Sequence, residues 1–450
     1  MSKRFAWLLG VVVLVSIGVL VACGSSYNAS SDGLVLVGSQ GSGLIETFSF
    51  SLNNGNVSAI DNTPTNTSNL TCVLNGLPSS IVIEPSGAYA YSIINANSAC
   101  PKSATGIATF KVNSGGTTAL TGSLVPFKPG PAAVVPGMMV MDPAGKFLFV
   151  ADRATTTDPS KPPVAYVSGS VSVFAIGSGG SVTEVPGSPF FPTAQTTVPQ
   201  SSLDIVSVAP TPTVFPAIGV NGVQNAVCSA VGLNPPTLQY LYAVDKLGNQ
   251  VFEFAVNTTT GVLTNPSNAS SVPSFSTDQT PEGIAVDPCN RFVYVSDNLT
   301  NNVSAYTMCN GSATQSSTNC PALPPGALVP VSGSPFTLSG SANGPGPLLV
   351  DPYGNNVYVL DTLSNTISPF KISPVSGALA PLSTATVATG LGPTSMAIRG
   401  DDNWLFVANF GSASLGGATV SQYSITPATG ALSVLPAIAT DNYPFGVAVK

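Results

Sequence analysis

Short apolar segments separated by tight turns recur along most of this 450-residue chain. Each unit begins with Pro or Gly and a short apolar segment, turns, continues as an aromatic-rich segment ending in Asp or Asn, and then carries two further segments. Short runs rich in Val, Ile, Tyr and Phe, bounded by Gly, Pro, Asn or Asp, predict β-strands. Six such units begin near residues 77, 136, 201, 281, 346 and 392. Internal similarity at this spacing predicts a repeat fold.

The turns and strands within a unit have recognisable chemistry. The first turn reads Asp or Glu, Pro, any residue, then Gly or Asn, at residues 84–87, 142–145, 287–290 and 351–354. Asp caps such a turn, Pro presets φ at the next position, and Gly or Asn tolerates the left-handed exit. The second strand is apolar on both faces, as in residues 292–295, which predicts that it packs between two other layers.

The two ends of the chain complement each other. Residues 33–60 contain a second, a third and a fourth strand but no first, whereas residues 443–449 contain a first strand with nothing after it. A ring of sheets removes its open edges if these ends pair in one blade. The predicted fold is therefore an all-β, seven-bladed β-propeller of four-stranded blades, closed by the N- and C-terminal strands.

Composition supports this fold and excludes several functions. Only 7% of residues are charged, while the chain holds 44 Gly and 40 Pro, a balance that suits short strands and tight turns. The net charge of −7, with no basic cluster, argues against a nucleic-acid partner. Histidine is absent, which removes the Ser-His-Asp triad and histidine metal sites. We expect no cofactor and no metal.

The N-terminus predicts export. Lys3 and Arg4 precede the apolar residues 5–19, and Leu-Val-Ala stands directly before Cys23, which is the pattern of a bacterial lipoprotein signal. We expect a signal peptide at residues 1–22, a lipid on Cys23, a tether at residues 23–32 and a propeller at residues 33–450. An uncleaved transmembrane anchor is the alternative, because residues 5–22 are just long enough to span a bilayer.

The predicted membrane partner is reached through this lipid. Gly24 and Ser25 follow Cys23 where an inner-membrane retention signal would place Asp. By resemblance to Gram-negative lipoproteins, we expect an outer-membrane location.

The other six cysteines predict three disulfides in an oxidising compartment, with free buried thiols as the alternative. Cys72 and Cys100 fall on loops of the top face, the face at which second strands end, and the remaining four fall on bottom loops. Pairing within a face gives Cys72–Cys100. For the bottom face we predict Cys309–Cys320 within one hairpin and Cys228–Cys289 between adjacent blades.

Several segments resemble a known family. Residues 283–288, 292–297 and 302–306, together with Gly-Ser-Pro-Phe at residues 187–190 and 333–336, look like the lactonase-like seven-bladed propellers and their YVTN-type relatives. The family takes its name from bacterial 6-phosphogluconolactonase, so the resemblance implies hydrolysis of a lactone ring. Many relatives, however, look like surface proteins of unknown role.

Candidate chemistry lies where the second strands end. The chain places a polar residue at each end, in the order Asn95, Asp152, Asp245, Asp297, Asp361 and Asn409. These residues cap turns in one interpretation and form a ring of carboxylates at the channel mouth in the other. Arg153 and Lys246 are the cations that directly follow two of these carboxylates.

Two functions follow. The scarcity of cations and the lack of histidine favour a lipid-anchored binding module that presents its top loops to a protein or glycan partner. The alternative is a lactonase-like enzyme in which Asp152, Asp245, Asp297 or Asp361 is the general base. Arg153 or Lys246 would then stabilise the oxyanion.

Overall fold

The structure is a computed structural model. It describes residues 32–40, 43–60, 65–66, 77–96, 105–127, 135–153, 155–156, 166–167, 169–192, 203–212, 239–266, 272–309, 320, 323–411, 417–441 and 443–450.

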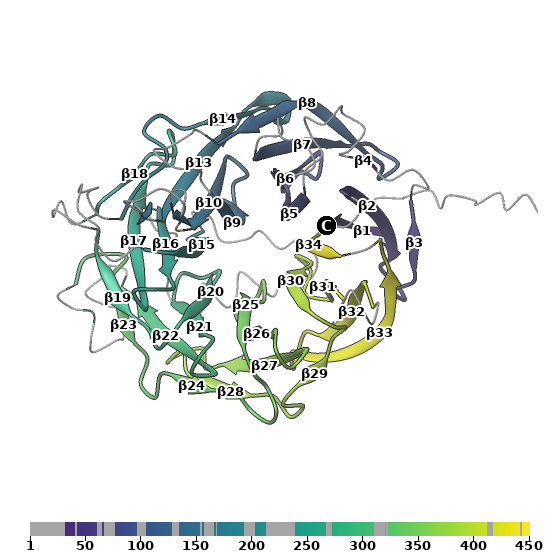
Figure 1. Cartoon of the computed structure of the whole chain (residues 1–450). Coiled ribbons are helices and arrows are strands. Elements are labelled where there is room, and N and C mark those ends of the chain that lie inside the picture. The colour runs from purple at the N-terminus through teal and green to yellow at the C-terminus, as the bar shows by residue number, and fades with distance from the viewer. Residues whose placement is uncertain are drawn as a thin grey trace, which may run out of the picture.

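Seven β-sheets surround a central axis (Figure 1). The innermost strands are β34, β5, β9, β15, β20, β25 and β30, which belong to blades 1 to 7 in that order. We call the end at which these first strands begin the top. The predicted seven-bladed all-β propeller is confirmed, and among the described residues only the 3-10 turn Ser178–Gly180 is helical.

The blades are built as follows. Blade 1 contains β34 (Pro444–Val449), β1 (Asp32–Ser39), β2 (Leu44–Ser51), β3 (Val57–Ala59) and β4 (Thr65–Asn66). Blade 2 contains β5 (Leu77–Ile83), β6 (Tyr89–Asn95), β7 (Gly106–Val112) and β8 (Thr118–Pro126). Blade 3 contains β9 (Val135–Met141), β10 (Phe147–Arg153), β13 (Ser170–Ile176) and β14 (Val182–Glu184). Blade 4 contains β15 (Ile205–Pro210), β16 (Gln239–Asp245), β17 (Gln250–Val256), β18 (Leu263–Thr264) and β19 (Ser274–Ser276).

The remaining blades repeat the pattern. Blade 5 contains β20 (Pro281–Val286), β21 (Phe292–Asp297), β22 (Asn302–Met308), β23 (Leu328–Pro330) and β24 (Phe336–Thr337). Blade 6 contains β25 (Pro345–Val350), β26 (Asn356–Asp361), β27 (Thr366–Ile372), β28 (Leu379–Pro381) and β29 (Val387–Ala388). Blade 7 contains β30 (Pro393–Ile398), β31 (Trp404–Asn409), β32 (Thr419–Thr426) and β33 (Ala431–Ala439). In blades 1, 4, 5 and 6 the outermost strand is split into two pieces that pair with the same third strand.

The chain ends close the ring as predicted. The C-terminal β34 pairs antiparallel with β1, so that Val35 faces Val449 and Val37 faces Val447. Leu34 and Lys450 exchange two backbone hydrogen bonds, at 3.0 and 2.9 Å, which add one residue pair at one end of this ladder. Figure 1 shows the yellow C-terminal strand beside the purple N-terminal strands. Neither chain end therefore leaves an unpaired inner edge.

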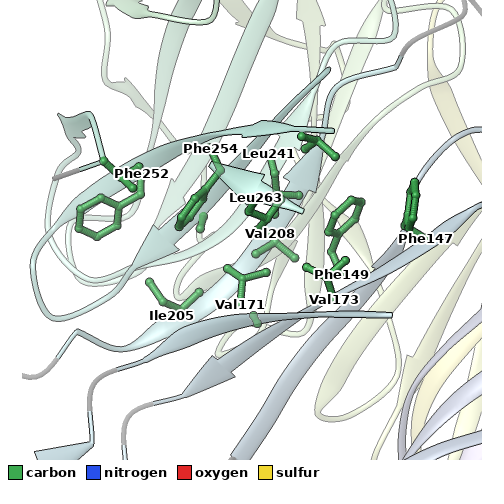
Figure 2. Packing of buried hydrophobic residues seen from close by; sticks show 14 of the residues in the cluster. Phe147, Phe149, Val171, Val173, Ile205, Val208, Leu241, Phe252, Phe254 and Leu263 are labelled. Carbon is green, nitrogen blue, oxygen red and sulfur yellow. The ribbon is translucent and has the colours of Figure 1, made fainter. Parts of the chain in front are cut away.

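Each junction between neighbouring blades is filled by its own apolar cluster, and seven such clusters occupy the seven junctions among the described residues. Figure 2 shows the cluster between blades 3 and 4, where Phe149 and Val173 meet Val208 and Leu241. The second strands are apolar on both faces because each face contacts a different blade.

Glycines in the hairpins between third and fourth strands let the blades approach closely. Gly377 has φ of 76°, and a Cβ atom built there would lie 2.4 Å from the Phe292 ring of the preceding blade. Gly261 stands in the same relation to Phe147, at 2.6 Å. The recurrent Gly-x-Leu hairpin is thus explained by both backbone conformation and close packing.

The disulfide prediction is confirmed where the structure describes both cysteines. Cys309 and Cys320 are bonded, with Cα atoms 5.4 Å apart. Cys289 is also disulfide-bonded. Its predicted partner Cys228 lies outside the described residues, as do Cys72 and Cys100.

The predicted signal peptide, Cys23 and tether lie almost entirely outside the described residues, and β1 begins at Asp32. Within the part of the chain that the structure describes, no helix has the length and apolar character needed to cross a membrane.

Gly446 provides a test of the closing strand. A Cβ atom at this position would lie 2.0 Å from the Ser79 backbone oxygen of blade 2. We expect Gly446→Ala to lower the free energy of unfolding by roughly 1–3 kcal/mol through overpacking, measured by denaturant titration. Gly115→Ala is the matched control, because nothing lies within 4 Å of its Cβ position. Equal stability of the two variants would show that β34 does not pack against β5 as described.

Candidate functional site at the top rim

A register shift lies near the top of the first strand in every blade. In blades 4, 5, 7 and 1 a single residue of the first strand has no paired residue across this shift, and these residues are Val206, Glu282, Thr394 and Phe445. A β-bulge re-aims a side chain and is common beside active sites. Glu282 is the charged member of this set.

Two ion pairs join neighbouring blades at this level. Arg153, at the end of β10, donates from Nη2 and Nε to Asp204, with distances of 2.7 and 3.2 Å, and Asp204 directly precedes β15. Lys246, which follows β16, donates from Nζ to the carboxylate of Glu282 on β20. Blade 4 therefore contributes one charged residue to each pair.

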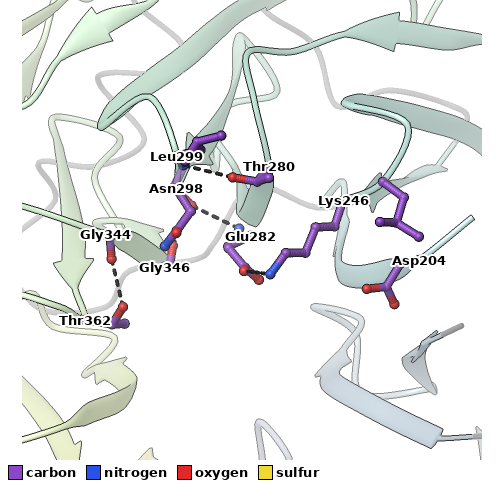
Figure 3. A network of polar contacts seen from close by, with 12 residues as sticks. Asp204, Lys246, Thr280, Glu282, Asn298, Leu299, Gly344, Gly346 and Thr362 are labelled. Carbon is purple, nitrogen blue, oxygen red and sulfur yellow. Dashed lines mark hydrogen bonds and ion pairs between the residues drawn. The ribbon is translucent and has the colours of Figure 1, made fainter.

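The two pairs act as one group of charges, which we call the rim cluster: Arg153, Asp204, Lys246 and Glu282. The hydrogen bond to Asp204 raises the pKa of the Arg153 guanidinium above its ordinary value, and the Glu282 charge acts in the same direction. Figure 3 shows the Lys246 side chain extended toward Glu282. The Arg153 side chain is 42% exposed, and ion pairs at such sites add at most about 1 kcal/mol of stability. Stability therefore gives little reason for this arrangement.

The carboxylates that end the second strands occupy different surroundings. Asp152 is 2% exposed, and Asp245, Asp297 and Asp361 are fully buried. These carboxylates are enclosed within the blades, so the interpretation of a carboxylate ring at the channel mouth does not describe them. Side chains that solvent does not reach in this structure are not placed to meet a substrate.

These carboxylates bind hydroxyl groups on the third strand of the same blade. Asp152 accepts hydrogen bonds from Ser170 and Ser172, at 2.8 and 2.7 Å. Asp297 accepts from the Ser304 hydroxyl at 2.7 Å. In blade 6 the Ser368 hydroxyl donates to Asp361 in the same way, at 2.7 Å. In blade 7 the direction is reversed, because the Asn409 amide nitrogen donates to the Ser421 hydroxyl at 2.9 Å.

Asp245 differs from these carboxylates because it caps backbone N–H groups, as the turn-capping interpretation predicts. Its Oδ1 atom accepts hydrogen bonds from the backbone N–H groups of Asp204 and Leu247, at 2.9 and 3.2 Å. Asp245 therefore helps to hold Asp204 at the start of β15. It supports the rim cluster without belonging to it.

Blade 1 contains the same contact with the partners exchanged. Ser39 ends its second strand, and Glu46 on the third strand supplies the carboxylate, 3.5 Å from the Ser39 hydroxyl. Glu46 also accepts a hydrogen bond from the backbone N–H of Asp441 in the incoming loop, at 2.8 Å. In blade 5 the Ser304 hydroxyl accepts the equivalent hydrogen bond from the backbone N–H of Asp278, at 3.3 Å. This exchange shows that the position serves to join the second strand, the third strand and the incoming loop.

Burial controls the protonation of these groups. It raises the pKa of Asp152 and of Asp297 to about 7 and that of Asp361 to about 6, against the lowering effect of the serine and threonine hydroxyl groups. One oxygen of each of these carboxylates has no hydrogen-bond partner. Ionising them in the folded protein is therefore unfavourable.

The junction between blades 7 and 1 is aromatic, whereas those on both sides of blade 4 are charged. Phe410, which occupies the position of Arg153 and Lys246, stacks on Tyr443 with ring centroids 4.7 Å apart. Phe445 completes this group in an edge arrangement, 6.4 Å from Phe410. In a ring of seven blades this junction lies opposite blade 4. The top rim is thus charged on one side and aromatic on the other.

The rim cluster can perform acid–base chemistry. A carboxylate can take a proton from water, and an adjacent cation can stabilise negative charge that develops on a carbonyl oxygen. Among the described residues, no group of three or more acidic or cysteine side chains is arranged to hold a metal ion.

Sequence reasoning identified Arg153 and Lys246 but missed their partners. Asp204 and Glu282 lie 51 and 36 residues further along the chain. One feature of the sequence could have identified these partners. Each carboxylate lies at the start of a first strand, and in a propeller this position adjoins the end of the second strand in the preceding blade, where each cation was predicted.

Comparisons with known proteins agree with this architecture. Residues 233–322 and 326–448 match the family model described as "Lactonase, 7-bladed beta-propeller". The predicted resemblance to lactonase-like seven-bladed propellers is confirmed. A comparison with curated proteins found no match.

Two of the similar solved structures carry the name of a lactonase. A candidate 6-phosphogluconolactonase from Bacteroides uniformis has a TM-score of 0.62 and 17% identity, covering 93% of this chain and 100% of its own. The periplasmic gluconolactonase PpgL of Pseudomonas aeruginosa has a TM-score of 0.62 and 16% identity, covering 93% and 99%. A protein from Lactobacillus plantarum has a TM-score of 0.63 and 14% identity, covering 93% and 99%. TM-scores of this size at such low identity show a shared fold alone.

The buried carboxylates predict an unusual dependence of stability on pH. Their folded pKa values of about 6 to 7 exceed the ordinary value near 4. The folded protein therefore binds more protons between about pH 4 and pH 7, and the free energy of unfolding falls as pH rises through this range. We expect the melting temperature to drop by at least about 5 °C from pH 5 to pH 8.

Asp297→Asn, which cannot ionise, should reduce this drop, whereas Glu84→Gln on a bottom turn should leave it unchanged. A melting temperature that is flat or rises between pH 5 and pH 8 in the parent protein would contradict the assignment.

Proposed function

We propose that this protein is an exported lactonase-like enzyme that hydrolyses a lactone at the rim cluster. The observation that carries the proposal is the convergence of two cations and two carboxylates from three neighbouring blades. The binding module, which the sequence favoured, rested on the scarcity of cations and the lack of histidine, and the two cations of the rim cluster weaken the first of these grounds. The lactonase family match supports the same choice.

Glu282 is the proposed general base and Lys246 the proposed oxyanion partner. Water attacks the lactone carbonyl carbon while Glu282 accepts one of its protons, and the carbonyl electron pair moves onto oxygen beside Lys246. Collapse of this tetrahedral intermediate breaks the bond between the carbonyl carbon and the ring oxygen, which takes the proton back from Glu282. One water is consumed and an open hydroxy acid forms.

The proposed membrane arrangement leaves this site accessible. β1 is a second strand, so it begins at the bottom of the propeller and runs toward the top. Lipid on Cys23 would connect through residues 24–31, which reach at most about 30 Å when extended. The bottom would then face the membrane, and the rim cluster would face away from it.

Hydrolysis of glucono-δ-lactone tests the proposal. We expect saturable turnover above the spontaneous rate, followed by titration of the released acid, and a fall in kcat of at least about 100-fold in Glu282→Gln and in Lys246→Gln. Glu84→Gln, a carboxylate on the opposite face, is the control and should keep parental activity. Equal activity of Glu282→Gln and Glu84→Gln, with all variants melting normally, would refute the assignment.

A phosphorylated lactone should offer no advantage. Phosphate binding requires two or more convergent cations, and both cations of the rim cluster already pair with carboxylates. We expect kcat/KM for 6-phosphogluconolactone to be no higher than for glucono-δ-lactone. A clear preference for the phosphorylated substrate, lost in Arg153→Ala, would show that Arg153 exchanges Asp204 for phosphate.

A further inference from the structure

Three leucines occupy one equivalent position at the top of blades 4, 5 and 6. Leu247, Leu299 and Leu363 each stand two residues after the buried carboxylate that ends the second strand, and they are 58%, 63% and 67% exposed. Leu391, 40% exposed, extends the series to the start of blade 7. We call these four residues the leucine row. Among the described residues, the other exposed large apolar side chains do not recur at one position of the repeat.

The turns that carry the first three leucines are held rigidly. Each contains an asparagine at positive φ, namely Asn249, Asn301 and Asn365 at 51°, 54° and 57°. The side-chain oxygen of each asparagine accepts a backbone N–H from the start of the next blade, at 2.8 Å, from Thr280, Gly344 and Gly392 respectively. The leucines are thus presented on ordered turns, and binding there would cost little backbone entropy.

The leucine row adjoins the rim cluster. Leu247 directly follows Lys246, and the Leu299 backbone N–H donates to the Thr280 hydroxyl at 2.9 Å, two residues before Glu282. Figure 3 shows Leu299, Thr280 and Glu282 together on the side toward which Lys246 extends. A ligand whose polar end reaches Glu282 therefore has apolar side chains beside it.

The turns that carry the row contain little charge, and Asp278, on the loop beside Leu299, is paired with the Asn302 amide nitrogen at 2.7 Å. Apart from Lys246, the residues of the three turns are Gly, Ser, Thr and Asn, so an apolar group placed there displaces few strongly hydrated groups. Continuity with the rim cluster favours a small amphipathic ligand over a separate macromolecule.

We infer that the leucine row binds the aliphatic substituent of the substrate, and that the natural substrate is a lactone carrying an alkyl chain. This inference rests on the proposed function, because it places the lactone carbonyl at Lys246 and Glu282. The ring would occupy the rim cluster, and the chain would lie across the leucines of blades 4 and 5. Each methylene that leaves water adds binding free energy, which favours longer chains.

A comparison of two lactones tests this inference. Rates would be measured with δ-valerolactone, which has no side chain, and δ-decalactone, which carries a pentyl chain. We expect kcat/KM to be at least about 10-fold higher for δ-decalactone in the parent protein. In Leu247→Ser/Leu299→Ser this ratio should fall toward one. The matched control is Val434→Ser, an exposed apolar residue on the outer strand β33 whose loss should leave the ratio unchanged.

The outcomes separate this inference from the proposed function. A parental ratio near one, or a ratio that the leucine variant does not change, overturns the alkyl-chain assignment while hydrolysis dependent on Glu282 still stands. The row would in that case be a surface for a protein partner. Failure to hydrolyse either lactone, while glucono-δ-lactone is still hydrolysed, overturns the alkyl-chain assignment alone. Failure with all three lactones overturns both proposals.

Discussion

Pairing of β34 with β1 is the contact on which the rest of the structure depends. Each blade buries both faces only because a neighbour stands on each side, so the ring has to close for any junction to be complete. The closing blade holds together through a ladder between residues more than 400 positions apart. The clusters on both of its sides contain residues from both chain ends, for example Val35 with Val447 and Leu36 with Ala448.

A closed ring gives seven copies of each backbone position while leaving its side chain free to vary. Where the second strand meets the third, most blades use a buried acid or amide with a serine, and blade 1 exchanges the two partners between Ser39 and Glu46. At the junctions of the top rim the side chains differ far more. They are charged around blade 4 and aromatic between blades 7 and 1. The backbone geometry is the same in every blade and forms the scaffold. The side chains at the top rim differ between blades, and these differences define the site.

The fold could be predicted from the sequence because turn chemistry and hydrophobic pattern repeat in every unit. The start of each first strand, the closure of blade 1 and the Cys309–Cys320 pair all followed from that pattern. The site could be predicted only in part. The sequence places Asp297 and Lys246 at the top, but it does not show that one turns inward and the other reaches the next blade. The β-bulge at Glu282 cannot be recognised from the pattern of apolar and polar residues in the sequence. The serine at position 304, on the facing strand, was the available sign that Asp297 is satisfied internally.

The central claim is that chemistry takes place at Lys246 and Glu282 on the rim, and not at the buried carboxylates. A crystal structure with bound δ-valerolactam, the unreactive amide counterpart of a lactone, tests it most directly. The account predicts the lactam carbonyl oxygen within hydrogen-bond distance of Lys246 Nζ and the Glu282 carboxylate facing the carbonyl carbon. A lactam bound at the bottom of the propeller, or one that reaches Asp152 or Asp297 through an opened blade, would contradict it.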